Sequence, residues 1–233
     1  FEAEIPACGL AVFPYEDQRI QGPEHGDYTY REYHEPKRSV GTMRNGALRW
    51  DTGKLTVEIS PNGVVGVCSK ETGSWLHDIM ALEDGGDVGD GWNYRKPLHD
   101  RRISSGPAGA EVSVLDDGPL YARIRITYSM LIPAETDPDT QARSGRLVET
   151  LISTTLELKK GSSLIECATE LENRAMDHRM RMLFATGLST REYATSTPFW
   201  MQRRPIELAD RSEYIETETN VFPNQGIITI ADK

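Results

Sequence analysis

The sequence has little cysteine and no long apolar run, and these two shortages exclude several kinds of protein. Cys8, Cys68 and Cys167 are odd in number and far apart, so neither a disulfide framework nor a zinc-binding spacing is present. No apolar run approaches the length needed to cross a bilayer, and the N-terminus lacks the basic-then-apolar pattern of a secretory signal. We therefore expect no membrane partner and a reducing, cytoplasmic location.

Positive charge is also scarce. The 26 Lys and Arg residues are outnumbered by 36 Asp and Glu residues, which gives a formal net charge of −10. Because nucleic-acid binding depends on cationic side chains and counterion release, this balance argues against a nucleic-acid partner. The 233 residues are enough for a buried core. The start at Phe1 rather than Met suggests a piece of a longer chain.

Familiar catalytic motifs are missing. The sequence has no Gly-x-Ser-x-Gly elbow, no phosphate-binding P-loop and no pair of histidines at the i, i+4 spacing of a helical zinc site. The five histidines are scattered along the chain: His25, His34, His77, His99 and His178. We expect this chain alone to hold no metal ion and no other cofactor.

Alternation of apolar and polar residues predicts β-strands, and no helical period is sustained. Leu55 to Ser60 alternates, Pro61-Asn62-Gly63 supplies a turn with positive φ at Asn62 or Gly63, and Val64 to Val67 resumes the strand pattern. Tyr121 to Ile132 alternates over a span that only a long strand explains. The residues expected on its buried face are Ala122, Ile124, Ile126, Tyr128, Met130 and Ile132.

A second hairpin is predicted around the turn Lys159-Lys160-Gly161-Ser162, between Val148–Leu158 and Leu164–Glu172. In the later of these two strands we expect Ile165, Cys167 and Leu171 to point inward. Two more strands are predicted further along the chain. Their alternating apolar residues are Met180, Met182 and Phe184 in the first, and Ile228 and Ile230 in the second.

Many strands separated by turns indicate an all-β fold, namely a large antiparallel β-sandwich in which two sheets cover each other's apolar faces. We assign residues 46–233 to this domain. Residues 1–45 carry a possible strand at Leu10–Phe13, followed by a polar, poorly periodic arm or tether. The polar segment 133–146 is expected to be a loop between two strands.

The segment Glu83–Tyr94 (EDGGDVGDGWNY) is the most informative one for function. Its four glycines permit tight turns and a close approach of the backbone to a ligand. Trp92 and Tyr94 offer flat apolar faces on which a sugar ring can stack, while Asp87 and Asp90 can accept hydrogen bonds from sugar hydroxyls. The composition therefore favours a loop that faces a carbohydrate.

Other roles for these aspartates stay open. Asp84, Asp87 and Asp90 recur every third residue, so the calcium-loop pattern of the EF-hand is not met, and ordinary use in turns is the more frequent role of such residues. Asp87 and Asp90 could also form the pair of carboxylates that glycoside cleavage requires, although acidic loops are far commoner than acidic catalytic pairs.

A second polar cluster runs from Glu172 to Phe184, between two predicted strands. We expect Asn173 and Asp177 to hold a turn through bonds from side chain to backbone. Arg174 and Arg179 are expected to pair with carboxylates. His178 is expected to be a hydrogen-bonded residue at a sheet edge rather than a catalyst.

Taken in order, these blocks resemble the region that follows the catalytic domain in glycoside hydrolase family 38, the retaining α-mannosidases. The resemblance covers nearly the whole chain. The residues that carry it are Asn62-Gly63, Lys70-Glu71-Thr72-Gly73, Glu83–Tyr94 with Pro97, Gly118–Arg123, Glu172-Asn173-Arg174, Asp177–Arg181, Phe199, Arg203-Arg204-Pro205 and Phe222-Pro223-Asn224-Gln225.

The resemblance implies a galactose-mutarotase-like supersandwich, some of whose closing strands would follow Lys233. It also implies that the zinc ligands, the aspartate nucleophile and the acid/base carboxylate lie in a catalytic domain outside this chain. The β region of such enzymes packs on that domain and lends an aromatic residue and an arginine to the sugar pocket. Trp92 occupies the aromatic position, and Arg203 or Arg204 is the candidate arginine.

The leading hypothesis is therefore the non-catalytic sandwich of a zinc-dependent α-mannosidase, which is inactive alone and forms part of the wall of a mannoside pocket. Its partner would be its own catalytic domain, and the apolar surface left for that domain could support self-association. The alternative is a free-standing carbohydrate-binding module or a mutarotase-like epimerase. An epimerase would need a base and an acid in one cleft, for which His99 or His178 with Glu83 are the natural candidates.

Overall fold

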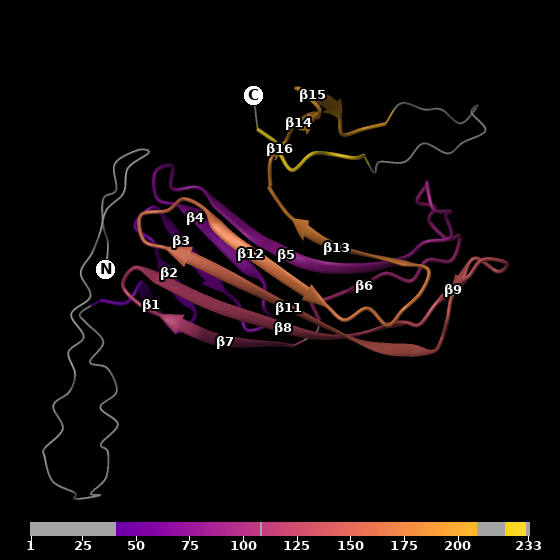
Figure 1. The fold of residues 1–233 in the computed structure, drawn as a ribbon, viewed down its shortest axis with the longest axis horizontal. Helices are drawn as coiled ribbons and strands as arrows, with labels where there is room; N and C mark the ends of the chain where they lie inside the picture. Colours follow the sequence, from indigo (N-terminus) through magenta and orange to yellow (C-terminus); the bar gives the residue numbers. More distant parts are fainter. Residues whose placement is uncertain (1–40, 108, 209–221, 232–233) are drawn as a thin grey trace, which may run out of the picture.

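The computed structural model describes residues 41–107, 109–208 and 222–231, and every regular element in these ranges is a β-strand (Figure 1). The strands are β1 (Arg44–Gly46), β2 (Arg49–Asp51), β3 (Leu55–Ile59), β4 (Val65–Ser69), β5 (Trp75–Gly86), β6 (Ile103–Ser104), β7 (Ala110–Asp117), β8 (Tyr121–Pro133), β9 (Thr136–Asp137), β10 (Ala142–Arg143), β11 (Leu147–Lys159), β12 (Ile165–Leu171), β13 (His178–Phe184), β14 (Glu192–Thr197), β15 (Trp200–Pro205) and β16 (Ile228–Thr229). The described residues include no helix that could cross a membrane.

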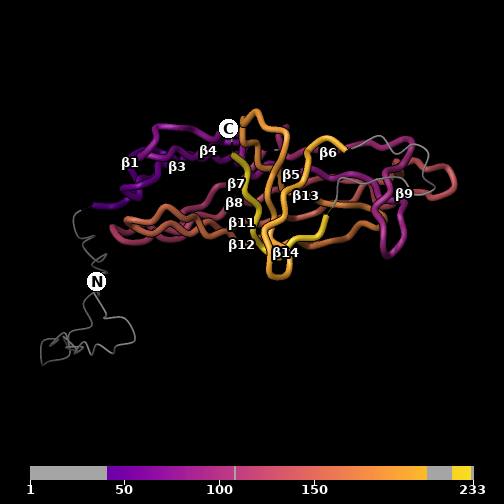
Figure 2. Tube along the Cα trace, turned by 90° about the horizontal axis from the view of Figure 1, so that it is seen from above, coloured from indigo at the N-terminus to yellow at the C-terminus, as the bar shows by residue number. Residues whose placement is uncertain are grey.

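Two sheets form the body of the molecule. The larger one has the order β1-β2-β3-β4-β5-β13, with β6 paired to β5, and the smaller one has the order β12-β11-β8-β7. Figure 2 shows them as two layers, one above the other. All pairings between these strands are antiparallel, so the prediction of an all-β antiparallel sandwich is confirmed.

The core fills the space between the two layers. All six residues predicted for the inner face of β8 are buried, with at most 2% of each exposed. From the opposite sheet they meet Trp50 and Val57, both fully buried. Gly63 takes a φ of +80°, as the predicted turn before β4 requires, and lies directly beneath the Tyr128 side chain. The period of two in the sequence therefore located the core correctly.

The prediction for β12 is partly wrong. Ile165 packs against the core, but Cys167 is exposed and Leu171 is 42% exposed. The reason is that β12 is the outer strand of its sheet, so the facing sheet covers it only near Ile165. The same holds at the outer strand β13, where Met180 and Met182 reach the core and Phe184 is 58% exposed.

Smaller sheets extend this sandwich. Strands β15, β14 and β16 form a three-stranded antiparallel sheet, which Figure 1 shows beyond the end of β13. Segment 133–146 is more ordered than the expected loop, because β9 and β10 pair within it as a short antiparallel ladder. The predicted strand Leu10–Phe13 and most of the predicted arm lie outside the described residues.

Candidate functional site

The acidic, glycine-rich segment starts as a strand and only then becomes a loop. Glu83 to Gly86, expected in the loop, form the last residues of β5 and pair with β13. Successive strand residues point to opposite faces, so Glu83 faces outward while Asp84 faces the core and is fully buried. The loop that leaves the sheet is therefore Asp87–Tyr94, and Asp84 belongs to the interior.

Asp87 and Asp90 both shape this loop through their Oδ1 atoms. Asp87 Oδ1 accepts hydrogen bonds from the backbone N–H groups of Gly89 (2.9 Å) and Arg95 (3.1 Å). Asp90 Oδ1 accepts from the N–H groups of Trp92 and Asn93, each at 2.8 Å. These two backbone donors hold the pKa of Asp90 below its usual value. The two predicted sugar-binding carboxylates thus also close the turns that present the aromatic residues.

The two aromatic residues of the loop have different surroundings. Trp92 is 92% exposed at the loop, whereas Tyr94 lies under Arg179, whose guanidinium carbon is 3.6 Å from the centre of the ring. Burial is the main cause that lowers the pKa of Arg179. Among the described residues Arg179 pairs with no carboxylate, so that prediction is wrong: the loop brings an aromatic ring over this outward-facing side chain of β13 instead.

A buried polar network holds the base of the loop. Asp84 Oδ2 lies 2.6 Å from Arg143 Nη1, with both side chains fully buried, and Asp84 Oδ1 lies 2.6 Å from His178 Nδ1. His178 Nε2 lies 2.9 Å from Asn173 Oδ1, which also accepts from the N–H of Ala175 and so holds its turn as predicted. The interpretation of His178 as a hydrogen-bonded residue of the outer strand β13 is confirmed.

Asp177 acts through its backbone rather than its carboxylate. Its carbonyl oxygen accepts hydrogen bonds from the Thr136 hydroxyl (2.8 Å) and from the N–H of Asp87 (2.9 Å). The first loop residue is therefore tied to the segment around β9 and to the start of β13. No sequence pattern indicated the part played by Arg143, since it lies in a segment whose composition predicts a polar loop.

A pocket of about 490 Å³ lies on the outer side of β13, against the three-stranded sheet. We call it the arginine pocket, and its lining residues include Arg179, Arg181, Arg204, Tyr193, Phe222 and Asn224. The Arg204 guanidinium lies 4.7 Å from the centre of the Phe222 ring, and its Nε and Nη2 atoms donate to Gln202. Arg181 pairs with Glu83, which lies directly opposite it on β5.

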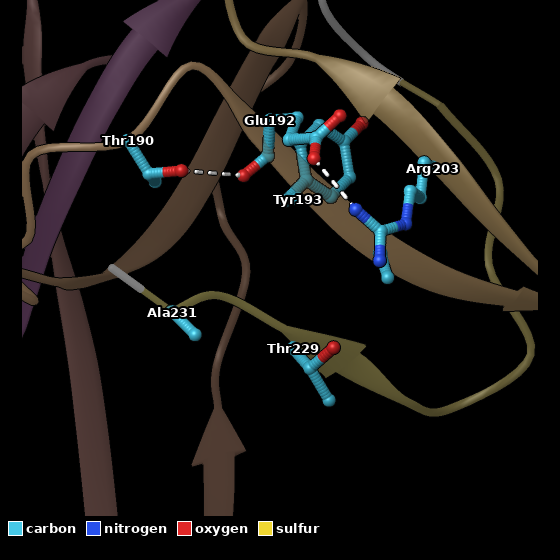
Figure 3. A pocket seen from close by; sticks show the side chains of 7 residues that line it. Thr190, Glu192, Tyr193, Arg203, Thr229 and Ala231 are labelled. Carbon is cyan, nitrogen blue, oxygen red and sulfur yellow. Dashed lines mark hydrogen bonds and ion pairs between the residues drawn. The ribbon is translucent and has the colours of Figure 1, made fainter. Parts of the chain in front are cut away.

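The Arg203 side chain points to the opposite face of β15 from Arg204, because successive side chains of a strand alternate between the two faces. Its Nη1 lies 2.7 Å from the Glu192 carboxylate, in a pocket of about 250 Å³ that Thr190, Tyr193 and Thr229 also line (Figure 3). A wider hollow of about 680 Å³ is lined by both Arg203 and Arg204. Arg179 and Arg204 line one pocket, and Tyr94 contacts it only through Arg179, while Trp92 stays on the exposed loop.

The side chains proposed for an epimerase do not come together. His178 faces the core with Asp84, while Glu83 is on the opposite face of the sheet and pairs with Arg181. His99 is exposed, and its N–H donates to the carbonyl of Gln141. Across residues 41–107, 109–208 and 222–231, no group of three or more His, Cys, Asp or Glu side chains is arranged to hold a metal ion.

Comparison with known proteins identifies the sandwich. The family model described as the glycosyl hydrolases family 38 C-terminal domain matches residues 50–233. A putative mannosylglycerate hydrolase from Halalkalibacterium halodurans is 24% identical over 181 residues, which are 72% of this chain and 19% of that protein.

Two solved structures from Enterococcus faecalis share the fold. An α-mannosidase superposes with a TM-score of 0.77 at 24% identity, over 83% of this chain and 23% of that chain. A second family 38 glycosyl hydrolase superposes with a TM-score of 0.68 at 24% identity, over 72% of this chain and 22% of that chain. This chain therefore spans about a fifth of the length of each of these three proteins.

Proposed function

Since this chain belongs to the glycosyl hydrolases family 38 C-terminal domain family, we propose that it is the non-catalytic β-sandwich of a larger α-mannosidase and forms one wall of its sugar pocket. The observation that carries the proposal is the family match over residues 50–233. The rest of the polypeptide would supply a zinc ion, the nucleophile of a retaining mechanism and the acid/base carboxylate. This chain would supply one wall of the sugar pocket and contacts with the sugar.

The loop geometry supports a role in the pocket wall. One carboxylate oxygen of Asp87 and one of Asp90 accept hydrogen bonds from the backbone of the loop. The buried ion pair of Asp84 and Arg143 lies at the base of the loop. A loop fixed in this way can present Trp92 to a sugar ring without a large loss of conformational entropy on binding. Stacking of the apolar face of a sugar on the exposed indole is the expected contact.

Exposed apolar side chains support a large protein partner. At the turn between β14 and β15, Phe199 is fully exposed and Trp200 is 72% exposed, and Met201 beside them is 42% exposed. Large aromatic side chains are enriched in the buried centres of interfaces. We propose that these residues contact the catalytic domain, and that the isolated chain self-associates through them.

The test compares this chain with the longer protein that contains it. The longer protein should hydrolyse an aryl α-mannoside in a zinc-dependent manner, and the chain alone should give no rate above a buffer blank. Hydrolysis by the purified chain would contradict the proposal that the catalytic groups lie outside it.

A free-standing carbohydrate-binding module is the second candidate, because Trp92 is exposed on a loop that its own carboxylates hold in shape. Titration of the chain with mannose, galactose and glucose, followed by tryptophan fluorescence, separates the two. Saturable binding of one of these sugars by the chain alone would favour the module, and flat titrations for all three would count against it.

A further inference from the structure

We propose that the arginine pocket binds a carboxylate group on the aglycone of the mannoside, with Arg179 and Arg204 as the residues that recognise it. This proposal rests on the proposed function, since it assigns a substrate class to the same sugar site. It explains a local excess of positive charge in an acidic protein: three arginines line one pocket of a chain whose formal net charge is −10.

The pairing of these arginines shows which of them are available. Arg181 has a carboxylate partner in Glu83. Among the described residues, neither Arg179 nor Arg204 has a carboxylate within ion-pair distance, and both stack on aromatic rings instead, namely Tyr94 and Phe222. Two cationic groups therefore line one pocket without an ion pair to any described carboxylate, although the charge of Asp87 acts on Arg179.

Stacking fixes the guanidinium groups in a way that suits anion recognition. A ring covers the flat face of a guanidinium but leaves its N–H edges free to donate in the plane. Arg204 Nη1 is buried and has no hydrogen-bond partner among the described residues. A buried donor without an acceptor is costly, and a ligand oxygen would offset that cost.

The geometry of an arginine fork favours a planar carboxylate, to which it can donate two parallel hydrogen bonds. The volume of about 490 Å³ is in the range of small-molecule sites. A relative of this chain is described as a putative mannosylglycerate hydrolase, and the glycerate group of such a substrate carries a carboxylate. We therefore assign the pocket to a small acid joined to mannose.

The arginine pocket is linked to the loop by one contact. Tyr94 ends the loop that carries Trp92, and its ring supports Arg179, which lines the pocket. In this proposal the mannose ring stacks on the loop and its acidic substituent points along the loop toward Arg179. The sugar contact and the acid contact would then be adjacent parts of one surface.

The test uses the longer protein and two substrates that differ only in the acid, α-mannosylglycerate and α-mannosylglycerol. Loss of a charged hydrogen bond predicts that Arg179→Gln and Arg204→Gln each lower kcat/KM for mannosylglycerate about 10- to 100-fold, mainly through KM, and change it less than about 2-fold for mannosylglycerol. Added salt should raise KM for mannosylglycerate more than for the neutral substrate. Arg49→Gln, on β2, is the matched control and should change neither substrate.

Thermal unfolding checks that each variant is folded, and Arg179→Lys keeps the charge while it removes the planar fork, so it should recover only part of the loss. Equal losses on both substrates would overturn the proposal and indicate a contact with the catalytic domain. A wild-type enzyme that hydrolyses both substrates equally well would also overturn it. Failure of the wild type to hydrolyse any α-mannoside would instead overturn the proposed function, and this proposal with it.

Discussion

Arg143 and Asp84 form an ion pair of 2.6 Å whose two side chains are both completely buried. Asp84 comes from the end of β5, an inner strand of the larger sheet, and Arg143 comes from β10, so the pair joins this sheet to the segment between β8 and β11. The loop Asp87–Tyr94 begins three residues after Asp84. The pair is thus placed to set the position of that loop relative to the sandwich.

Replacement of Asp84 by Asn should destabilise the protein strongly. The change leaves the Arg143 guanidinium buried without its counter-charge, which typically costs about 3–5 kcal/mol. Urea unfolding of the variant and the parent measures the difference. Glu58→Gln is the control, since its partner Arg49 and Glu58 itself are both about half exposed and such pairs contribute little. Similar losses for the two variants would contradict the assignment.

Substitution of Gly63 by Ala should cost more stability than the same change at Gly53. Both glycines have positive φ, so an added Cβ strains the backbone at either position by about 1–2 kcal/mol. At Gly63 the new Cβ would also lie 2.7 Å from the Ala110 Cβ and collide with the Tyr128 hydroxyl, while at Gly53 it would meet open space. We expect an extra loss of about 1–3 kcal/mol at Gly63, measured by chemical unfolding. Equal losses of unfolding free energy at Gly63 and Gly53 would show that backbone strain, without a steric clash, accounts for the effect.

Tyr128 should make stability depend on pH in the alkaline range. Burial raises the pKa of Tyr128 to about 12, whereas an unfolded tyrosine titrates near 10. Between these values the unfolded chain loses a proton that the folded chain keeps, so this contribution is complete below about pH 10 and is lost as pH rises toward about 12. The loss is at most about 3 kcal/mol. Urea unfolding from pH 9 to 12 should show a steeper decline for the parent than for Tyr128→Phe, and parallel declines would contradict the prediction.

Truncation of Trp92 should affect activity without affecting stability. Because the side chain is 92% exposed, Trp92→Ala should change the free energy of unfolding by less than about 0.5 kcal/mol. In the longer protein we expect KM for an α-mannoside to rise about 2- to 10-fold, as for the loss of one stacking contact. Leu164→Ala is the control, since Leu164 is 72% exposed at the β11–β12 turn and should leave KM unchanged. A change in KM of similar size for both variants would remove Trp92 from the sugar site.

The sequence predicted the sandwich well where one strand lies between two others. The inner face of β8 and the turn at Gly63 follow from local rules, since a period of two and a glycine at positive φ need no knowledge of distant residues. The same rule failed for Cys167 and Leu171, because a period of two gives the face of a strand and not whether another sheet covers that face. Coverage depends on strand order, which is a property of the whole chain.

In the candidate site, too, local features were predictable from the sequence and long-range contacts were not. The sequence by itself determined the all-β class, the turn chemistry of Asp87 and Asp90, and the local bond of His178 to Asn173, because each depends on residues near in the chain or on composition. Only the tertiary structure decided that Asp84 and Arg143 meet in the interior, that Arg179 stacks on Tyr94, and that Arg204 rather than Arg203 shares its pocket. These contacts join residues that are tens of positions apart, and strand pairing in space, not spacing along the chain, brings them together.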